Sequence, residues 1–201
     1  ISKKNIIVIG NPITEVIFFN KSKINNSKIL DKFSLKKNEF FLLTLHRQEN
    51  VDNILRFKKF LNILNKIVKI HNKKLVWPIH PRSKLMLNKL NYKLNEKIIL
   101  IKPLGFFDFI KLESSSFIVL TDSGTVQEEC SILKKPCLIV REYTERPETI
   151  LAGGSYLTGF KEKNILNKIN YIKKNKLKIS KIKDYSSIQI SSKVLRILLK
   201  K

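Results

Sequence analysis

The chain has 201 residues, enough for one large domain with its own buried core. Its formal net charge of +24 would favour a nucleic acid partner, but the excess is lysine spread over the whole chain with only six arginines, so we expect a small anionic substrate and no nucleic acid. No apolar run approaches the ~18 residues of a membrane span and no apolar signal segment follows Ile1-Ser-Lys-Lys, so we expect a cytoplasmic protein without a membrane partner.

The amino-terminal segment mixes apolar and lysine-rich stretches. The apolar run Asn5–Ile9 predicts a strand, and a Gly-Asn-Pro turn and a short helix from Thr14 follow it. Residues 20–38 are polar and rich in lysine, which predicts a linker or an irregular segment. The run Phe40–Leu45 is apolar again and predicts a second strand, with His46 at its end.

Helices and strands alternate in the middle of the chain. Asp52 is the expected N-cap of a helix that ends at Lys69, because apolar side chains recur there every three or four positions. The further predicted elements here are two strands and two helices, at Lys74–Ile79, Lys97–Ile101, Ser83–Leu90 and Phe106–Leu112. His80 directly follows the first of these two strands.

A strand, a tight turn, a helix and another strand follow. The apolar run Phe117–Leu120 predicts a buried strand, Asp122–Thr125 a turn, Val126–Leu133 a helix and Cys137–Val140 a strand. Such a turn lies at the carboxyl end of a parallel strand, where its backbone N–H groups point outward. This arrangement is typical of a phosphate site.

Polar side chains are concentrated in the same segment. Ser123 and Thr125 are candidate N-caps, and Glu128 is placed for a capping box with Thr125. One of the adjacent carboxylates at 128 and 129 can reach a sugar hydroxyl, and Arg141 and Arg146 offer rigid forks suited to diphosphate. We expect the nearby acids to be salt-bridge partners of these arginines, namely Glu142, Glu145 and Glu148.

The alternation of elements predicts the fold. The last predicted elements are helices at 147–152, 163–172 and 191–199 and a strand at 155–158. We therefore expect an α/β fold, a three-layer α/β/α domain with a doubly wound parallel sheet of about six strands and its site at the carboxyl ends of the strands. The spacing of Cys130 and Cys137 matches no metal motif, so we expect intracellular thiols, no metal and no cofactor.

Five motifs in one order resemble a known family. DSGTVQEE followed by KPCLIVREYTERPET is similar to the signature of the non-hydrolysing UDP-N-acetylglucosamine 2-epimerases. TLHRQEN at Thr44–Asn50, HPR at His80–Arg82, GNP at Gly10–Pro12 and PLGFFDF at Pro103–Phe109 match further family motifs. The resemblance covers Gly10 to Glu148.

The resemblance implies an incomplete enzyme. It places residues 1–20 at the end of an amino-terminal domain or hinge, and residues 21–201 in the UDP-binding Rossmann-like domain, with a helical tail, of a glycosyltransferase-B architecture. The family inverts C2 of a UDP-N-acetylhexosamine by eliminating and re-adding UDP, and its proton-handling carboxylates lie on the amino-terminal domain. We therefore expect this chain alone to be inactive, and the intact isomerase to be a homodimer in polysaccharide biosynthesis.

The resemblance also assigns roles to single residues. It makes His46 catalytic and places Phe109 against the uracil ring, with Phe107 in the core. Arg47 and His80 would contact phosphate or a regulatory ligand. The expected UDP ligands are Ser123, Gly124, Thr125, Glu129 and Arg146. Without the resemblance, we would expect His46 to be a surface or capping residue and Phe109 to lie in the core, and His80 could be a satisfied histidine before a proline turn.

Two alternatives remain at this stage. The same architecture serves nucleotide-sugar glycosyltransferases, and a non-catalytic sugar-nucleotide binding module is also compatible with the motifs. The turn reads DSGT where most of the family has DSGG, which resembles the branch that acts on UDP-2-acetamido-2,6-dideoxyhexoses on the route to UDP-N-acetyl-L-fucosamine.

Overall fold

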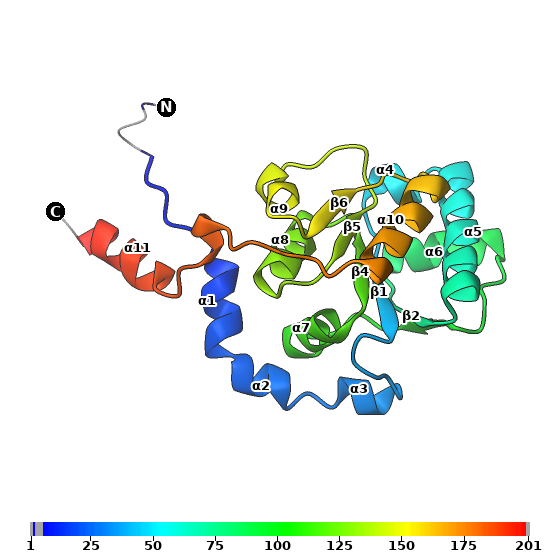
Figure 1. The fold of residues 1–201 in the computed structure, drawn as a ribbon, viewed down its shortest axis with the longest axis horizontal. Helices are drawn as coiled ribbons and strands as arrows, with labels where there is room; N and C mark the ends of the chain where they lie inside the picture. Colours follow the sequence, from blue (N-terminus) through cyan, green and yellow to red (C-terminus); the bar gives the residue numbers. More distant parts are fainter. Residues whose placement is uncertain (1, 3–5, 200–201) are drawn as a thin grey trace.

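The computed structural model describes residue 2 and residues 6–199, which form a sheet-based body and a smaller extension (Figure 1). We call residues 20–181 the body and residues 6–19 together with 182–199 the extension. The segments that enter and leave the body, residues 6–19 and 182–199, lie together on one side of it. In Figure 1, α1 and the carboxyl-terminal helix α11 project from the body at the left of the view.

The body is built on a six-stranded parallel sheet with the strand order β3-β2-β1-β4-β5-β6. This order confirms the predicted doubly wound α/β fold, because the chain moves outward from β1 in one direction and then from β4 in the other. The strands are β1 (Phe40–Thr44), β2 (Lys74–Pro78), β3 (Ile98–Ile101), β4 (Ile118–Thr121), β5 (Cys137–Ile139) and β6 (Ser155–Leu157).

Helices cover both faces of the sheet, which gives three layers. Successive strand residues point to opposite faces, so Phe41 and Leu43 pack into one core cluster and Phe40 and Leu42 into the other. The first cluster includes Phe60 of α5. The longer helices of the body are α5 (Ile54–His71), α6 (Pro81–Leu90), α7 (Phe106–Ser115), α8 (Gly124–Ile132) and α10 (Glu162–Lys174).

Shorter helices complete the described chain. In the body they are α2 (Lys21–Asn25), α3 (Ile29–Lys32), α4 (Gln48–Val51) and α9 (Pro147–Leu151). The extension holds α1 (Pro12–Phe19), the 3-10 helix η2 (Lys183–Tyr185) and α11 (Ile190–Leu199). No helix in the part of the chain that the structure describes is long and apolar enough to cross a membrane.

Two predictions for the amino-terminal segment were wrong. Asn5 lies outside the described residues, and Ile6–Ile9 form no strand, since no strand of residues 6–199 pairs with them. Residues 20–38 are not an irregular linker, because α2 and α3 bury Ile24 and Ile29 against the body. Their isolated apolar residues are hidden in the sequence by the surrounding lysines and asparagines.

Three local predictions also need correction. The N-cap of α5 is Asn53, whose side chain accepts the Arg56 N–H at 3.0 Å, whereas Asp52 ends α4. The capping box in α8 does not form, because the helix already begins at Gly124 and Thr125 lies inside its first turn. Phe107 is exposed rather than in the core, and Lys23 lies over its ring.

Candidate nucleotide site

The carboxyl ends of β1 and β4 bring His46 and Asp122 together. Thr44 and Thr121, the last residues of these strands, are paired in register. The Asp122 carboxylate, which is fully buried, accepts backbone N–H bonds from His46 at 3.1 Å and Arg47 at 2.8 Å. The side chain of Asn50 donates to it as well, at 3.1 Å. Asp122 therefore fixes the loop that follows β1.

Asp122 also orients the His46 ring. The His46 Nδ1 lies 3.2 Å from Asp122 Oδ1, and the His46 side chain is 39% exposed. Burial raises the pKa of Asp122, but hydrogen bonds from His46, Arg47 and Asn50 outweigh it, so the pKa is lowered. The charged Asp122 carboxylate holds the His46 ring in place, and a ring held in this way can stabilise negative charge in front of it.

Arg47 and His80, which were predicted to contact phosphate or a regulatory ligand, also have partners within the chain. Arg47 Nε donates to the backbone carbonyl of Asp122 at 3.3 Å. The His80 ring centroid lies 5.7 Å from that of His46, and His80 Nδ1 accepts the Arg82 N–H at 3.2 Å as the N-cap of α6. His80 therefore caps a helix and also lies beside the candidate catalytic residue.

The turn after β4 forms the start of α8. Ser123 is the N-cap residue, and its own N–H donates to the Thr121 hydroxyl at 2.9 Å. Gly124 lies beneath the Arg146 guanidinium, because a Cβ at Gly124 would be 3.7 Å from Arg146 Cζ. A helix N-terminus with a guanidinium above it suits an anion such as a phosphate.

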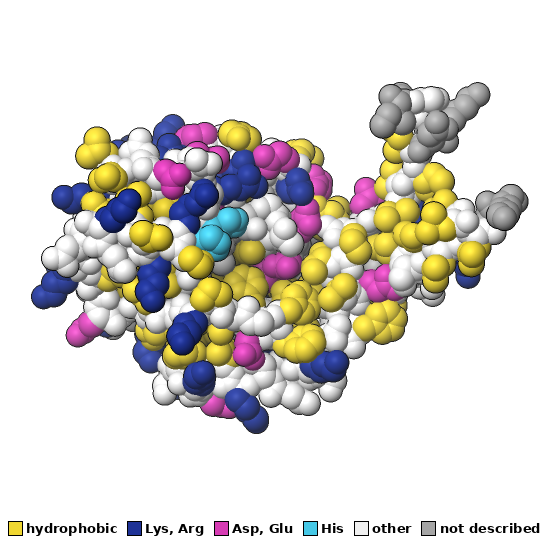
Figure 2. Space-filling view, turned by 180° about the vertical axis from the view of Figure 1, so that it is seen from behind, with side chains coloured by type: hydrophobic (Ala, Val, Ile, Leu, Met, Phe, Trp, Pro, Cys, Tyr) yellow, Lys and Arg dark blue, Asp and Glu magenta, His cyan; other side chains and the backbone are white. Residues whose placement is uncertain are grey.

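Arg146 is paired with Glu128, and the extension contacts the same carboxylate. Its Nε donates to Glu128, and the other oxygen of Glu128 accepts from Asn11 Nδ2 at 2.8 Å. An open cleft of about 730 Å³ lies here, and Thr125, Glu128 and Arg146 contribute to its walls together with Asn11 and Tyr185 of the extension. Figure 2, which is turned by 180° from the view of Figure 1, shows histidine side chains on the body beside lysine, arginine and acidic side chains.

Arg141 is not available to a diphosphate, contrary to the prediction. It is 2% exposed and makes a two-fold ion pair with Glu145, at 2.8 and 3.0 Å. The pairing with Glu145 was predicted. The other two acids differ from the prediction, because Glu142 pairs with Arg56 at 3.4 Å and Glu148 accepts from the Tyr185 hydroxyl.

Phe109 and Glu129 lie on the α7 side of the turn. Phe109 is half-buried and packs against the core cluster that contains Val126 of α8. Glu129 is 6% exposed, and burial raises its pKa to about 7. The structure thus groups Thr125 and Arg146 on the cleft, whereas Phe109 and Glu129 are not among the residues that line it.

Sequence reasoning missed two supporting residues, Asp122 and Asn11. Asp122 is the first residue of the predicted turn, so its place at the end of a buried strand was a usable signal. Asn11 caps α1 and also donates to Glu128 across 117 positions of sequence, which no local pattern indicates. Within residues 6–199 no group of three or more histidine, cysteine or acidic residues is arranged to hold a metal ion.

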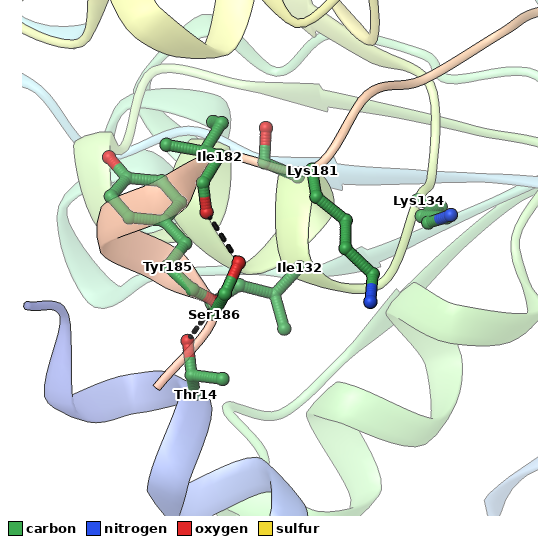
Figure 3. Close-up of a pocket in the computed structure, with 8 residues that line it drawn as sticks. Thr14, Ile132, Lys134, Lys181, Ile182, Tyr185 and Ser186 are labelled. Atoms are coloured by element: carbon green, nitrogen blue, oxygen red, sulfur yellow. Dashed lines mark hydrogen bonds between the residues drawn. The ribbon is translucent and has the colours of Figure 1, made fainter. Parts of the chain in front are cut away.

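A second, smaller cavity of about 200 Å³ marks the junction of body and extension (Figure 3). Thr14 of α1 donates to the backbone carbonyl of Tyr185 at 2.8 Å, and Ser186 donates to that of Ile182 at 2.7 Å. Ile132 is the last residue of α8, and Lys134 follows it in the next turn. The entering and returning segments of the chain therefore touch the body at the same helix.

The chain matches a family model described as UDP-N-acetylglucosamine 2-epimerase over residues 1–199. Two curated relatives are UDP-N-acetylglucosamine 2-epimerases of Methanocaldococcus jannaschii and Methanococcus maripaludis. The first is 38% identical over 84% of this chain and 48% of its own length. The second is 41% identical over 83% of this chain and 48% of its own length.

A comparison with solved structures points to the same family. The crystal structure of the M. jannaschii UDP-GlcNAc 2-epimerase in complex with UDP-GlcNAc and UDP superimposes with a TM-score of 0.89 at 34% identity. The match covers 100% of this chain and 56% of that one. The chain spans about half the length of the curated relatives it matches.

Proposed function

The chain belongs to the UDP-N-acetylglucosamine 2-epimerase family, and we propose that it is the UDP-binding, carboxyl-terminal half of an enzyme that inverts C2 of a UDP-N-acetylhexosamine. The observation that carries this proposal is the pairing of His46 with the buried Asp122, beside a helix N-terminus topped by Arg146. This arrangement can bind a diphosphate and stabilise the charge that it gains when it leaves.

The proposed reaction begins with loss of the proton at C2 of the sugar. The C1–O bond then breaks, and UDP departs with the electron pair while a C1–C2 double bond forms. UDP adds back to C1, and a proton is delivered to the opposite face of C2. The His46 imidazolium stabilises the UDP charge at both bond-breaking and bond-forming steps.

We propose the following ligands for UDP, which the geometry of the turn supports. Phosphate oxygens accept from the free N–H groups of α8's first turn at Gly124 and Thr125, and Arg146 turns from Glu128 toward them. Ser123 adds its hydroxyl. Glu129 accepts from the ribose hydroxyls and Phe109 contacts the uracil ring. Arg47 and His80 serve a neighbouring ligand rather than the reacting one.

The base that removes the C2 proton lies outside this chain in our proposal. The acids beside the cleft have partners that UDP binding leaves in place: Glu128 with Asn11, Glu145 with Arg141, and Glu148 with Tyr185. A general base needs a free carboxylate within hydrogen-bond reach of its proton. An amino-terminal domain that faces the cleft would supply it.

The extension is the proposed attachment to that domain. Ile6, Ile7 and Val8 are more than half exposed, as are Leu195 and Leu198 of α11. Exposed apolar side chains concentrated in one small region indicate a contact surface. We therefore propose that residues 1–20 are the end of the amino-terminal domain or the hinge, and residues 21–201 the UDP-binding domain with a helical tail, whose described part returns along the hinge.

Solvent-deuterium incorporation at C2 of UDP-N-acetylglucosamine, read by mass spectrometry, tests the proposal. We expect no exchange by the chain alone and clear exchange when it is joined to the amino-terminal half of a close relative. A glycosyltransferase or a simple binding module would give no exchange in either form. Robust exchange by the lone chain would place the base within these residues and refute the division of labour.

Two narrower proposals accompany this one. The DSGT turn supports a substrate of the UDP-2-acetamido-2,6-dideoxyhexose type, because Thr125 adds a hydroxyl beside the cleft where most of the family has glycine. Relative turnover of the joined protein on 6-deoxy and 6-hydroxy substrates tests it.

We also propose that the intact enzyme is a cytoplasmic homodimer that does not bind nucleic acid, which light scattering and a DNA-binding titration would check.

A further inference from the structure

Gln127 is a buried amide beside the candidate site, and the proposed function leaves it without a role. It lies on α8, in the turn that follows Gly124, and is 1% exposed. Its Nε2 donates to the backbone carbonyl of Arg146 at 3.1 Å and to the Thr149 hydroxyl. Its Oε1 accepts from the Thr144 hydroxyl at 2.7 Å. Both ends of the amide therefore bond to residues 144–149.

These bonds hold the backbone of Arg146 on both sides. The Arg146 N–H donates to the Thr144 hydroxyl oxygen at 3.1 Å, and this hydroxyl in turn donates to Gln127. The Arg146 carbonyl accepts from Gln127 and also from the Thr149 hydroxyl, at 2.9 Å. A carbonyl can only accept, so this contact sets which end of the Gln127 amide faces Arg146. Both polar groups of the Arg146 main chain are thus tied to α8.

The place of Arg146 in the fold gives this attachment its importance. Arg146 follows the loop after β5 and is the N-cap residue of α9. Its guanidinium lies over Gly124 in the first turn of α8, and Gln127 lies about one turn later on the same helix. The helix whose N-terminus would face the phosphates therefore also sets the position of the guanidinium above it.

We propose that Gln127 is a positioning residue for the diphosphate and that it acts through Arg146. With its backbone held, Arg146 only has to swing its side chain from Glu128 to the phosphate oxygens, so little conformational freedom is lost when UDP binds. Without the amide, the Arg146 carbonyl and the Thr144 hydroxyl lose their bonds to α8, and the guanidinium is no longer held above the helix. This inference rests on the proposed function, in which Arg146 contacts the diphosphate.

The alternative is a purely structural role, in which Gln127 only attaches α9 to α8. Such a role predicts a loss of stability, and any loss of UDP affinity would then be the same whether or not the Arg146 side chain is present. A positioning role predicts that the effect of Gln127 on UDP binding disappears when the Arg146 side chain is removed. A double-mutant cycle separates the two roles.

Calorimetry with UDP on this chain tests the proposal. Gln127→Met keeps an unbranched side chain without the amide, and it should weaken UDP binding about fivefold to tenfold, a part of the effect expected for Arg146→Ala. In the Arg146→Ala background the same substitution should change the affinity by less than about twofold. Ser131→Ala is the matched control, because Ser131 is buried on the same helix and its hydroxyl has no hydrogen-bond partner among the described residues. It should leave the affinity unchanged.

A second pair of variants keeps the test decisive even if Gln127→Met does not fold. Thr144 is only half-buried, and Thr144→Val removes the hydroxyl that links Gln127 to the Arg146 N–H. This variant should also weaken UDP binding. Thr144→Ser keeps the hydroxyl and should bind UDP within about twofold of the wild type.

The outcomes separate this inference from the proposed function. Equal losses from Gln127→Met in the two backgrounds would overturn the role of Gln127, and so would wild-type affinity in Thr144→Val. Wild-type affinity in Arg146→Ala would instead overturn the proposed diphosphate site, and this inference with it.

Discussion

The body and the extension use the same apolar residue types in opposite ways. In the body, Phe40, Phe41 and Phe60 are at most 1% exposed, because helices cover both faces of the sheet. In the extension, Phe19 is 69% exposed and Leu198 is 72% exposed. The body therefore buries these large apolar side chains, whereas the extension carries apolar surface that the described part of the chain does not cover. Burial in the body stabilises the fold, whereas we propose that the exposed surface of the extension contacts another domain.

The largest expected effect comes from a matched pair of phenylalanines. Phe60→Ala should lower the free energy of unfolding by about 3–5 kcal/mol, because it empties a site packed against Phe160 at a ring distance of 4.4 Å. Phe19→Ala should change it by less than about 0.5 kcal/mol. Urea unfolding of both variants measures the difference. Similar losses in the two variants would show that the extension is packed in solution and would break the comparison.

The same contrast explains what could be predicted from the sequence. The strands of the body were predicted within a residue or two, because runs such as Phe40–Leu45 are buried by elements of the same chain. The run Asn5–Ile9 is also apolar, yet its described part forms no strand, because local apolarity does not reveal whether a pairing edge exists.

In the candidate site, loop residues at strand ends were predictable and their partners were not. His46 and the Ser123 turn follow apolar runs, so a parallel sheet had to bring them to one edge. The bond between Asn11 and Glu128, and the ion pair of Arg141 with Glu49, depend on contacts between distant segments. Hydrogen bonds and ion pairs of that kind leave no periodic signal in a sequence.

The catalytic contribution of the body rests on His46. In the joined enzyme, His46→Asn should lower turnover by about 10²–10³-fold, the effect of removing one group that stabilises transition-state charge. The affinity for UDP should change by less than about threefold, since the ground state carries less charge at that position. Steady-state kinetics and UDP calorimetry measure the two effects. His71→Asn, at the end of α5 and against Phe41, is the control. Full activity of His46→Asn would remove the catalytic role from this chain.

A pair of arginines compares the two regions in binding. Arg146→Ala should weaken UDP binding by about 1.5–3 kcal/mol, the range for a hydrogen bond to a charged group. Arg196→Ala, in α11 of the extension, should have no measurable effect on the lone chain. Calorimetry with UDP gives both values. If neither Arg146→Ala nor Ser123→Ala alters the affinity, the assignment of the diphosphate to this turn is wrong.

A further expected effect is the pH dependence of stability, which again separates the regions. The pKa of Glu129 rises from an unfolded value of about 4.3 to about 7 in the folded body. Between these values the folded state binds more protons than the unfolded state, so stability falls as the pH rises through this window. Glu113 acts in the same direction, and Asp122 in the opposite one, because its lowered pKa gives stability that is lost only in stronger acid.

Thermal unfolding between pH 5 and 8 would measure this dependence, in the range set by the unfolded and folded pKa values of a buried acid. Glu129→Gln removes the titrating group and should flatten the decline. Glu15→Gln should leave the decline as it is in the wild type, because Glu15 is exposed in the extension and Ser191 lowers its pKa by hydrogen bonds, so it is already ionised throughout this window. A wild-type stability that rises across the window would contradict the raised pKa of the buried Glu129. A decline that Glu15→Gln abolishes and Glu129→Gln preserves would instead place the controlling group in the extension.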